Sequence, residues 1–129
     1  MGVPVVSRYS PLVVDHFEHP RNTGCFDPAA DVIEARAGST GQGALFQFSA
    51  RIAAGALAEV RFQVYGCPHC VAAASWLSER LSNATLDDLA SWSWREAADA
   101  LDVPAEKRGR LLILEDAVRR LAEAWRSRR

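Results

Sequence analysis

Two cysteines at positions 67 and 70 are the side chains best suited to chemistry in this sequence. They stand in Tyr-Gly-Cys-Pro-His-Cys at residues 65–70, where an alternating run ends and an alanine-rich helical run begins. A cysteine at a helix N-terminus faces unpaired backbone N–H groups and the positive end of the helix dipole, which favour its thiolate. A thiolate binds metal ions and attacks disulfides, and His69 would add a positive charge or a further ligand. The other interpretation is that Cys67 and Cys70 are small buried hydrophobic residues, because free cysteine is among the most buried residue types.

A single Cys-x-x-Cys pair supplies only part of a structural zinc site, so further ligands would have to come from elsewhere. The remaining candidates are Cys25, His16 and His19. His16 and His19 have a spacing that would let them share one metal ion on a helix; alternatively, His16 packs or caps locally and His19 ends the helix before Pro20. Cys25 follows a glycine in a predicted loop and is either a ligand or an ordinary loop residue.

The elements that position the thiol pair follow from the hydrophobic periodicity. Ser10 and Pro11 suit the start of a helix that Pro20 must end, and residues 20–31 are typical of a loop. Three β-like runs are expected near 32–37, 44–53 and 57–65, with a glycine turn before the third and the clearest apolar–polar alternation in the second and third. Helices are expected at 67–81, with one apolar face, and over 111–125. Residues 85–88 and 93–96 are both capping-box patterns, so a short helix is expected to start at each. This order predicts a two-layer α+β domain, with the helices packed on a three-stranded antiparallel sheet.

The composition limits the classes of function. The chain of 129 residues has the length of one domain, and 49% hydrophobic and 24% charged residues are typical of a globular protein. Fifteen Lys and Arg against sixteen Asp and Glu argue against nucleic-acid binding, which usually needs a basic excess. No apolar stretch approaches the ~20 residues of a membrane span, and the apolar run at residues 1–6 is too short for a signal peptide. Three cysteines do not make a disulfide scaffold, so we expect a single cytoplasmic domain over residues 1–129.

Three segments of the sequence form one set of motifs. Residues 9–26 carry YSxxVxDHFxxPRNxGxF, residues 62–67 carry FxxYGC, and residues 114–117 carry LEDA. Together they resemble the iron–sulfur cluster assembly scaffold family, IscU and the N-terminal domain of NifU. The three segments are similar to its N-terminal signature, its strand-to-helix segment with the second ligand cysteine, and the start of its last helix. The similarity covers about residues 9–125, leaves a basic tail at 126–129, and implies the same α+β fold.

The resemblance implies a cluster site from which this sequence departs. The family builds its cluster on three cysteines, with an aspartate and a histidine beside the first and third. Matching the glycine-rich loop puts Thr40 at the first cysteine and Gln42 at the aspartate. Counting back from the LEDA motif puts Gly109 at the position of the family's histidine and Arg110 at the position of its third cysteine. Of the family's three ligand cysteines, this sequence therefore keeps only Cys67. None of these side chains replaces a thiolate as an iron ligand, and Arg110 would place a fixed positive charge beside a bound cation.

The resemblance also implies protein partners. In the family, a cysteine desulfurase delivers sulfur, and a specialised Hsp70-type chaperone binds a short Leu-Pro-Pro-Val-Lys motif. That motif falls on residues 103–107 of this chain. Val103, Pro104 and Lys107 are the candidate chaperone-binding residues there, and the residues between Pro104 and Lys107 are altered.

The leading hypothesis is a divergent scaffold protein, a carrier or binding protein rather than an enzyme. Cys67 would accept persulfide sulfur, or would hold iron, zinc or an iron–sulfur cluster together with Cys70. Water, His69, Cys25 or the thiol pair of a second chain in a homodimer would then complete the metal ligands. The first alternative is a family member that binds no metal and acts as a protein-binding module. The second is a thiol–disulfide oxidoreductase, because Cys-Pro-His-Cys also looks like the active site of oxidising thioredoxin relatives.

Overall fold

The sheet has the expected three antiparallel strands, in the order β1-β2-β3. The strands are β1 (Val32–Ser39), β2 (Ala44–Ala53) and β3 (Ala56–Tyr65). A turn of 3-10 helix, η2 (Thr40–Gln42), joins the first two strands, and a tight turn at Gly55 joins β2 to β3. The computed structural model describes residues 9–128, so the expectations for residues 1–6 and for Arg129 at the end of the basic tail lie outside it.

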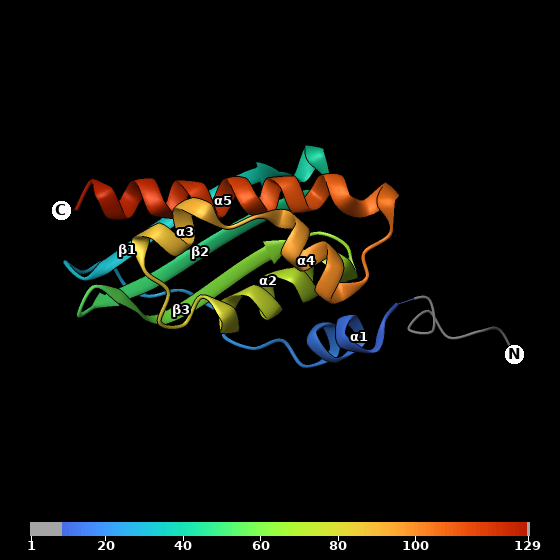
Figure 1. Cartoon of the computed structure of the whole chain (residues 1–129), viewed down its shortest axis with the longest axis horizontal. Coiled ribbons are helices and arrows are strands. Elements are labelled where there is room, and N and C mark those ends of the chain that lie inside the picture. Colours follow the sequence, from blue (N-terminus) through green and yellow to red (C-terminus); the bar gives the residue numbers. More distant parts are fainter. Residues whose placement is uncertain (1–8, 129) are drawn as a thin grey trace, which may run out of the picture.

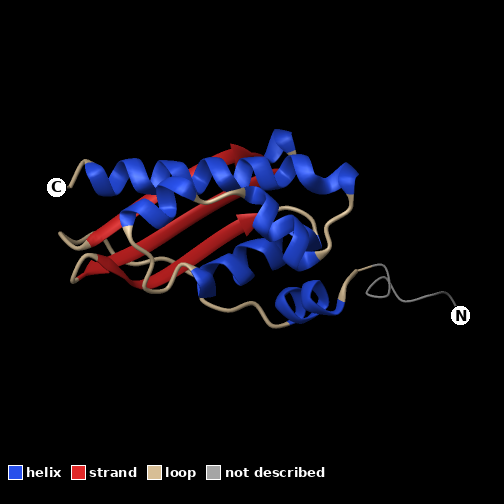
Figure 2. Cartoon of the chain, viewed as in Figure 1, coloured by secondary structure: helices blue, strands red, loops and turns tan. Residues whose placement is uncertain are grey.

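The α-helices gather on one side of the sheet (Figure 1). They are α1 (Pro11–Glu18), α2 (Pro68–Arg80), α3 (Leu86–Ser91), α4 (Trp94–Leu101) and α5 (Arg108–Arg126), with a 3-10 turn, η3 (Ala105–Lys107), before α5. Helix α5 packs across β1 and β2, α2 packs on β3, and α1 packs on α2. Figure 2 shows the resulting layers, with the strands behind the helices. The predicted two-layer α+β architecture is confirmed.

Local sequence signals set the starts of α1 and α3 as predicted. The Ser10 hydroxyl accepts a hydrogen bond from the Val13 N–H at 3.3 Å, and Pro11 is the first residue of α1. At the start of α3, Thr85 and Asp88 exchange the two hydrogen bonds of a capping box. Such caps satisfy backbone N–H groups that a helix leaves without internal partners. At α4 the expected capping box of Ser93 and Glu96 does not form, because the Glu96 carboxylate accepts a hydrogen bond from Arg80 at 2.6 Å.

Helix α2 is buried on nearly all sides, whereas the sequence led us to expect one apolar face. Residues 72–78 are all buried, and Val71 is half-buried. The helix lies between β3 on one side and α1 on another. Its alanines and serines are small enough for both neighbours to approach closely. The packing therefore holds α2, and with it the residues at its N-terminus, in a fixed position.

The loop at residues 20–31 crosses the face of the sheet that the helices leave open. The Phe26 ring lies between two arginines, 4.8 Å from the guanidinium carbon of Arg51 and 4.2 Å from that of Arg61. The Phe26 N–H also donates to the Ser49 hydroxyl at 3.1 Å. Cation–π contacts and this hydrogen bond anchor the loop on the sheet.

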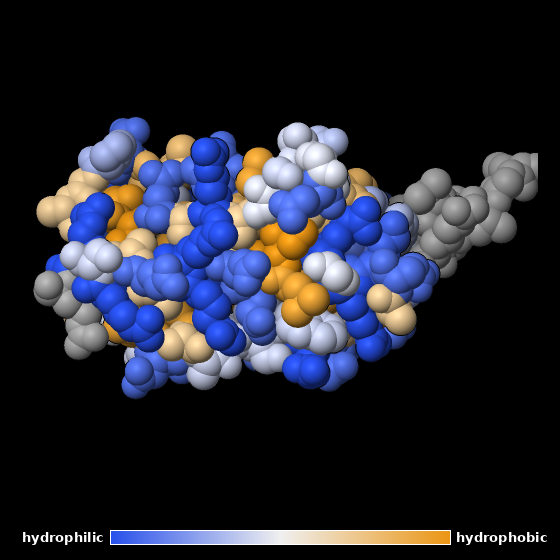
Figure 3. Space-filling view, turned by 90° about the horizontal axis from the view of Figure 1, so that it is seen from above, coloured by the Kyte–Doolittle hydropathy of each residue, from blue (hydrophilic) through white to orange (hydrophobic). Residues whose placement is uncertain are grey.

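The surface on the α5 side is mostly hydrophilic, with an apolar patch near its middle (Figure 3). Leu112 of α5 is 48% exposed and is one of the large hydrophobic side chains that reach the surface. None of the α-helices in the described part of the chain has the length and the apolar composition that crossing a membrane requires.

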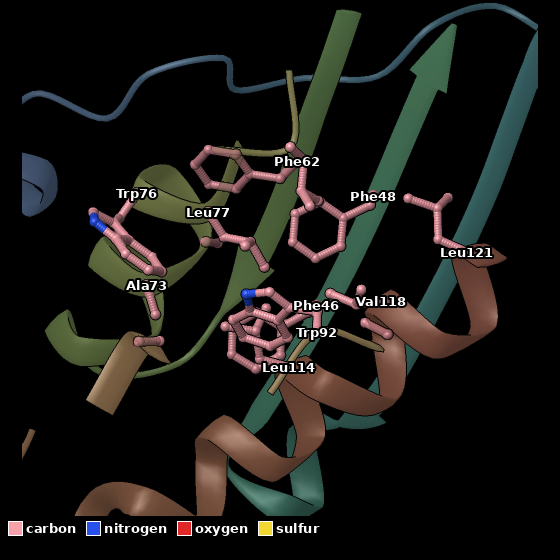
Figure 4. Close-up of a cluster of buried hydrophobic side chains, with 14 of the residues drawn as sticks. Phe46, Phe48, Phe62, Ala73, Trp76, Leu77, Trp92, Leu114, Val118 and Leu121 are labelled. Atoms are coloured by element: carbon pink, nitrogen blue, oxygen red, sulfur yellow. The ribbon is translucent and has the colours of Figure 1, made fainter. Parts of the chain in front are cut away.

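The core lies between the helices and the covered face of the sheet (Figure 4). Phe46 and Phe48 of β2 and Phe62 of β3 point toward Leu77 of α2 and Leu114 of α5, and all five are almost fully buried. The alternation predicted for the second and third strands is thus confirmed.

Candidate functional site

The two sulfur atoms of the Cys-x-x-Cys motif lie 3.7 Å apart where β3 passes into α2. Cys67 is the residue that precedes the first turn of α2, and the backbone N–H of Cys70 donates to its carbonyl oxygen at 2.9 Å. Both cysteines are free. Cys70 is 1% exposed, whereas Cys67 is only partly buried. The sequence predicted the helix start at Cys67, and the structure adds that solvent reaches the two thiols very differently.

Gly66 leaves the space that the Cys70 side chain occupies. A Cβ atom at position 66 would lie 2.7 Å from both the Cβ and the Sγ of Cys70, and 3.3 Å from the carbonyl oxygen of Gly43. Real Cβ atoms do not make contacts of 2.7 Å, so this position has no room for a side chain. The glycine therefore brings the strand end, the η2 turn and the Cys70 sulfur close together.

Arg110 approaches the same place from α5. A Cβ atom at Gly43, which closes the η2 turn with a φ of +82°, would lie 3.3 Å from a terminal nitrogen of the Arg110 guanidinium. The Arg110 Nε is buried and has no hydrogen-bond partner among the described residues. The Arg110 charge acts on the Cys67 thiol. The site thus combines a pair of thiols with a guanidinium whose Nε–H group donates no hydrogen bond within the described residues.

The surroundings of the pair lower the pKa of Cys67. The main cause is the hydrogen bond with the Cys70 thiol; backbone N–H groups of Cys70 and His69 and the Arg110 charge act in the same direction, while burial opposes them. Together they lower the pKa of Cys67 from 9.0 to about 4. The same hydrogen bond and burial raise the pKa of Cys70 above its usual value. At neutral pH, Cys67 is therefore the thiolate and Cys70 is the protonated partner.

Of the four residues that the resemblance placed at the lost ligand positions, Arg110 is the one that acts on this pair. Thr40 and Gln42 form the exposed η2 turn next to Gly43, and the Gln42 side chain accepts a hydrogen bond from the Ser39 hydroxyl at 3.2 Å. Gly109 is exposed in the first turn of α5. Within residues 9–128, no group of three or more His, Cys, Asp or Glu side chains is placed to hold a metal ion.

His69 is buried rather than open to solvent, with 6% of its surface exposed. Its ring meets the Tyr9 ring edge to face, with centroids 4.8 Å apart. The His69 Nδ1 atom is buried and has no hydrogen-bond partner within the described chain. The backbone N–H of His69 supports the Cys67 thiolate, as described above, so the residue contributes to the site through its main chain.

The other candidate ligands, His16, His19 and Cys25, differ in their surroundings. His16 is buried, and its Nδ1 lies 2.8 Å from the Ser75 hydroxyl of α2, whereas His19 is exposed at the end of α1. Burial lowers the pKa of His16, so the ring is neutral at neutral pH. Cys25 is exposed in the loop, where its carbonyl oxygen accepts a hydrogen bond from Arg61. His16 holds α1 against α2, as the packing interpretation predicted.

The segment with the candidate chaperone-binding residues leads into α5. Val103 is 1% exposed, and Pro104 and Lys107 are half-buried. The Arg108 side chain donates to the Val103 carbonyl oxygen at 3.1 Å. The first position of this motif therefore belongs to the core of the domain.

The role of Arg110 toward the thiol does not follow from the sequence alone. Its charge is an obstacle to a metal ion, and it also stabilises the Cys67 thiolate. The available signal was the glycine pattern: Gly43 and Gly66 lack side chains where the η2 turn, Arg110 and the thiol pair meet. Glycines at such positions indicate a close approach of the backbone.

Comparison with known proteins gives one family for nearly the whole chain. The family model described as "NifU-like N terminal domain" matches residues 8–129. The chain is 29% identical over 124 residues to the mitochondrial iron sulfur cluster assembly protein 1 of Candida glabrata, covering 94% of this chain and 58% of that protein. It is 28% identical over 123 residues to the iron-sulfur cluster assembly scaffold protein IscU of Escherichia coli K12, covering 94% of this chain and 96% of that protein.

Solved structures show the same fold. The N-terminal part of a nitrogen-fixing NifU-like protein from Brucella abortus superposes with a TM-score of 0.66 at 17% identity, covering 92% of this chain and 94% of that one. A chain from Fervidobacterium islandicum AW-1 superposes with a TM-score of 0.68 at 13% identity, covering 92% and 99%. The fold described above is therefore shared with both structures.

Proposed function

The chain belongs to the NifU-like N-terminal domain family, and from this membership we propose that it is a divergent scaffold protein of iron–sulfur cluster assembly that carries sulfur rather than a cluster. The group that carries sulfur is the Cys67 thiolate, which accepts the outer sulfur atom of a persulfide. The observation that carries the proposal is the setting of Cys67, which is partly exposed, hydrogen-bonded to Cys70 and subject to the charge of Arg110. The protein acts as a carrier, not as a catalyst.

An iron–sulfur cluster does not fit the residues around Cys67. Clusters are held by several soft, anionic thiolates, whereas this site has one thiolate and one thiol. Arg110 repels a metal cation and attracts an anion. Its buried Nε, which has no partner in the described chain, is a donor for an anionic sulfur species.

Sulfur transfer to Cys67 needs no oxidant or reductant. The Cys67 thiolate attacks the outer sulfur of the donor persulfide, and a new S–S bond forms. The S–S bond of the donor breaks, and the donor leaves as a thiolate with the electron pair of that bond. The product is a Cys67 persulfide, which is again an anion beside the Arg110 charge.

A cysteine desulfurase is the sulfur donor that we propose, because it forms persulfides and serves the family. The free dithiol suits a reducing compartment, so we place this exchange in the cytoplasm. The desulfurase would have to present its persulfide to Cys67, since Cys70 is buried.

The test uses protein in which the exposed Cys25 is replaced by serine, so that it does not compete for sulfur. Cys25→Ser/Cys70→Ser protein and Cys25→Ser/Cys67→Ser protein are incubated anaerobically with a cysteine desulfurase and cysteine. Intact-mass and peptide mass spectrometry then locate added sulfur. We expect the mass of the first protein to rise by one sulfur atom at Cys67, and that of the second to stay unchanged.

Two results would contradict the proposal. One is the absence of added sulfur on Cys67 although circular dichroism shows folded protein. The other is equal sulfur uptake by the variant that lacks Cys67. With anaerobic iron or zinc and no sulfur donor, the expected result is no bound metal above the level of the Cys67→Ser protein.

A further inference from the structure

We propose that Cys70 is the resolving thiol of this site: it displaces the sulfur carried by Cys67 as hydrosulfide and leaves a Cys67–Cys70 disulfide. The inference rests on the proposed function, because it needs a persulfide on Cys67. It adds an activity that sulfur carriage alone does not include, the reduction of the carried sulfur within a single chain.

The distance between the sulfurs supports this step. The Cys70 Sγ lies 3.7 Å from the Cys67 Sγ, whereas a disulfide bond is about 2.0 Å long. The gap is a van der Waals contact, so a small rotation of either side chain brings the atoms to bonding distance. Gly66 allows this contact, because a side chain at that position would occupy the space of the Cys70 sulfur.

The exposure of the two thiols assigns their roles. Cys67 is partly exposed and meets an external persulfide, while Cys70 is 1% exposed and is shielded from it. The Cys70 thiol nevertheless touches the Cys67 sulfur, which is the inner sulfur of the persulfide. Cys70 is therefore placed to attack that inner sulfur and no external one.

The atoms and electrons of the step balance. Cys70 gives up its proton and forms an S–S bond to the Cys67 Sγ. The bond between the Cys67 Sγ and the carried sulfur breaks, and the carried sulfur leaves with the electron pair. It takes the proton and becomes hydrosulfide. The two thiols are oxidised to a disulfide, the carried sulfur is reduced to sulfide, and an external thiol or dithiol reductant restores the pair.

Arg110 favours this outcome because the leaving group is an anion. Its guanidinium lies beside Gly43, at the turn that faces Gly66, and its Nε is a buried donor with no partner in the described chain. A positive charge at this place stabilises the sulfide that departs from Cys67. The same charge disfavours a metal cation, so the site is suited to release sulfide and not to collect iron.

The experiment compares Cys25→Ser protein with Cys25→Ser/Cys70→Ser protein, and with Cys25→Ser/Cys70→Ala protein as a second replacement. Each is fully reduced, freed of reductant and mixed anaerobically with glutathione persulfide. Free sulfide is measured by a colorimetric assay, and the state of Cys67 is measured by mass spectrometry after rapid alkylation. Circular dichroism verifies that the variants are folded.

We expect the Cys25→Ser protein to release hydrosulfide in equimolar amount with chains that carry the Cys67–Cys70 disulfide. Both Cys70 variants should keep the persulfide on Cys67 and release sulfide at least about tenfold more slowly. Two results would overturn the inference and leave the proposed function intact. One is a Cys67 persulfide that is as stable in the Cys25→Ser protein as in the Cys70 variants. The other is sulfide release at the same rate from all three proteins. Absence of sulfur on Cys67 in every protein would instead overturn the proposed function, and this inference with it.

Discussion

The Cys70 sulfur lies 3.7 Å from the Cys67 sulfur and is almost completely shielded from solvent, while Cys67 is partly open to it. This contact lowers the pKa of the Cys67 thiol and raises that of the Cys70 thiol, although the two groups are chemically identical. A buried thiol that donates a hydrogen bond stabilises the neighbouring thiolate, and its own proton becomes harder to remove. The thiol that reacts with an external persulfide is thus defined before the persulfide arrives.

The alkylation rate of Cys67 should be nearly independent of pH from about pH 6 to about pH 8. Its pKa is lowered to about 4, so the thiolate fraction is already complete at the lower end of this range. In the Cys70→Ala protein the main cause of the lowered pKa is removed, and the rate should rise with pH over the same range. Iodoacetamide kinetics on a Cys25→Ser background measure both profiles. A pH-dependent rate in protein with Cys70 present would contradict the assignment.

Replacing Arg110 by glutamine should raise the pKa of Cys67, because the nearby positive charge is lost. Alkylation should slow by roughly two- to threefold at about pH 4.5, close to that pKa, and change little at about pH 6. Arg110→Lys keeps the charge and is the matched control, for which we expect a smaller change. The same iodoacetamide assay applies. Equal rates in the arginine, lysine and glutamine proteins would show that the charge at this position does not act on Cys67.

Gly66→Ala should reduce the free energy of unfolding by about 1–3 kcal/mol and move the two sulfurs apart. The added methyl group would lie 2.7 Å from the Cys70 side chain. Gly109→Ala is the control, because a Cβ there meets nothing within 4 Å, and alanine favours the helix. Urea denaturation and the rate of Cys67–Cys70 disulfide formation measure the two effects. Equal stability of both variants would contradict the close packing at position 66.

Restoring three of the four lost ligands should restore metal binding. The Thr40→Cys/Gln42→Asp/Arg110→Cys protein again has the three cysteines and the aspartate at the family's ligand positions, and the repelling charge is gone. We expect this protein to retain zinc through dialysis and the parent chain to lose it, as measured by elemental analysis. The same triple variant with Cys67→Ser should bind zinc markedly more weakly. Equal zinc retention by the parent chain would contradict the role given to Arg110.

Much of the fold could be predicted from local patterns. The alternation in β2 and β3, and the capping residues Ser10 and Thr85, depend on neighbours in the chain, and both were confirmed. The burial of α2 on nearly all sides could not be predicted, because it depends on α1 packing against it from far away in the sequence.

The candidate site was predictable only in part for the same reason. The position of Cys67 at a strand-to-helix junction follows from residues 65–70, which are contiguous. The shielding of Cys70, the burial of His69 and the charge of Arg110 beside the thiol depend on contacts between distant segments. The spacing alone therefore does not distinguish the two cysteines, whereas the fold leaves Cys67 partly exposed and buries Cys70.

One competition experiment tests most directly whether Cys67 carries sulfur rather than metal. Cys25→Ser/Cys70→Ser protein is incubated anaerobically with a cysteine desulfurase, cysteine and ferrous iron, then desalted and analysed for sulfane sulfur and iron beside a Cys25→Ser/Cys67→Ser control. We predict sulfane sulfur that is absent from the control, and no iron above the level of the control. Iron bound in proportion to the chain and lost with Cys67, with no sulfane sulfur, would contradict the account.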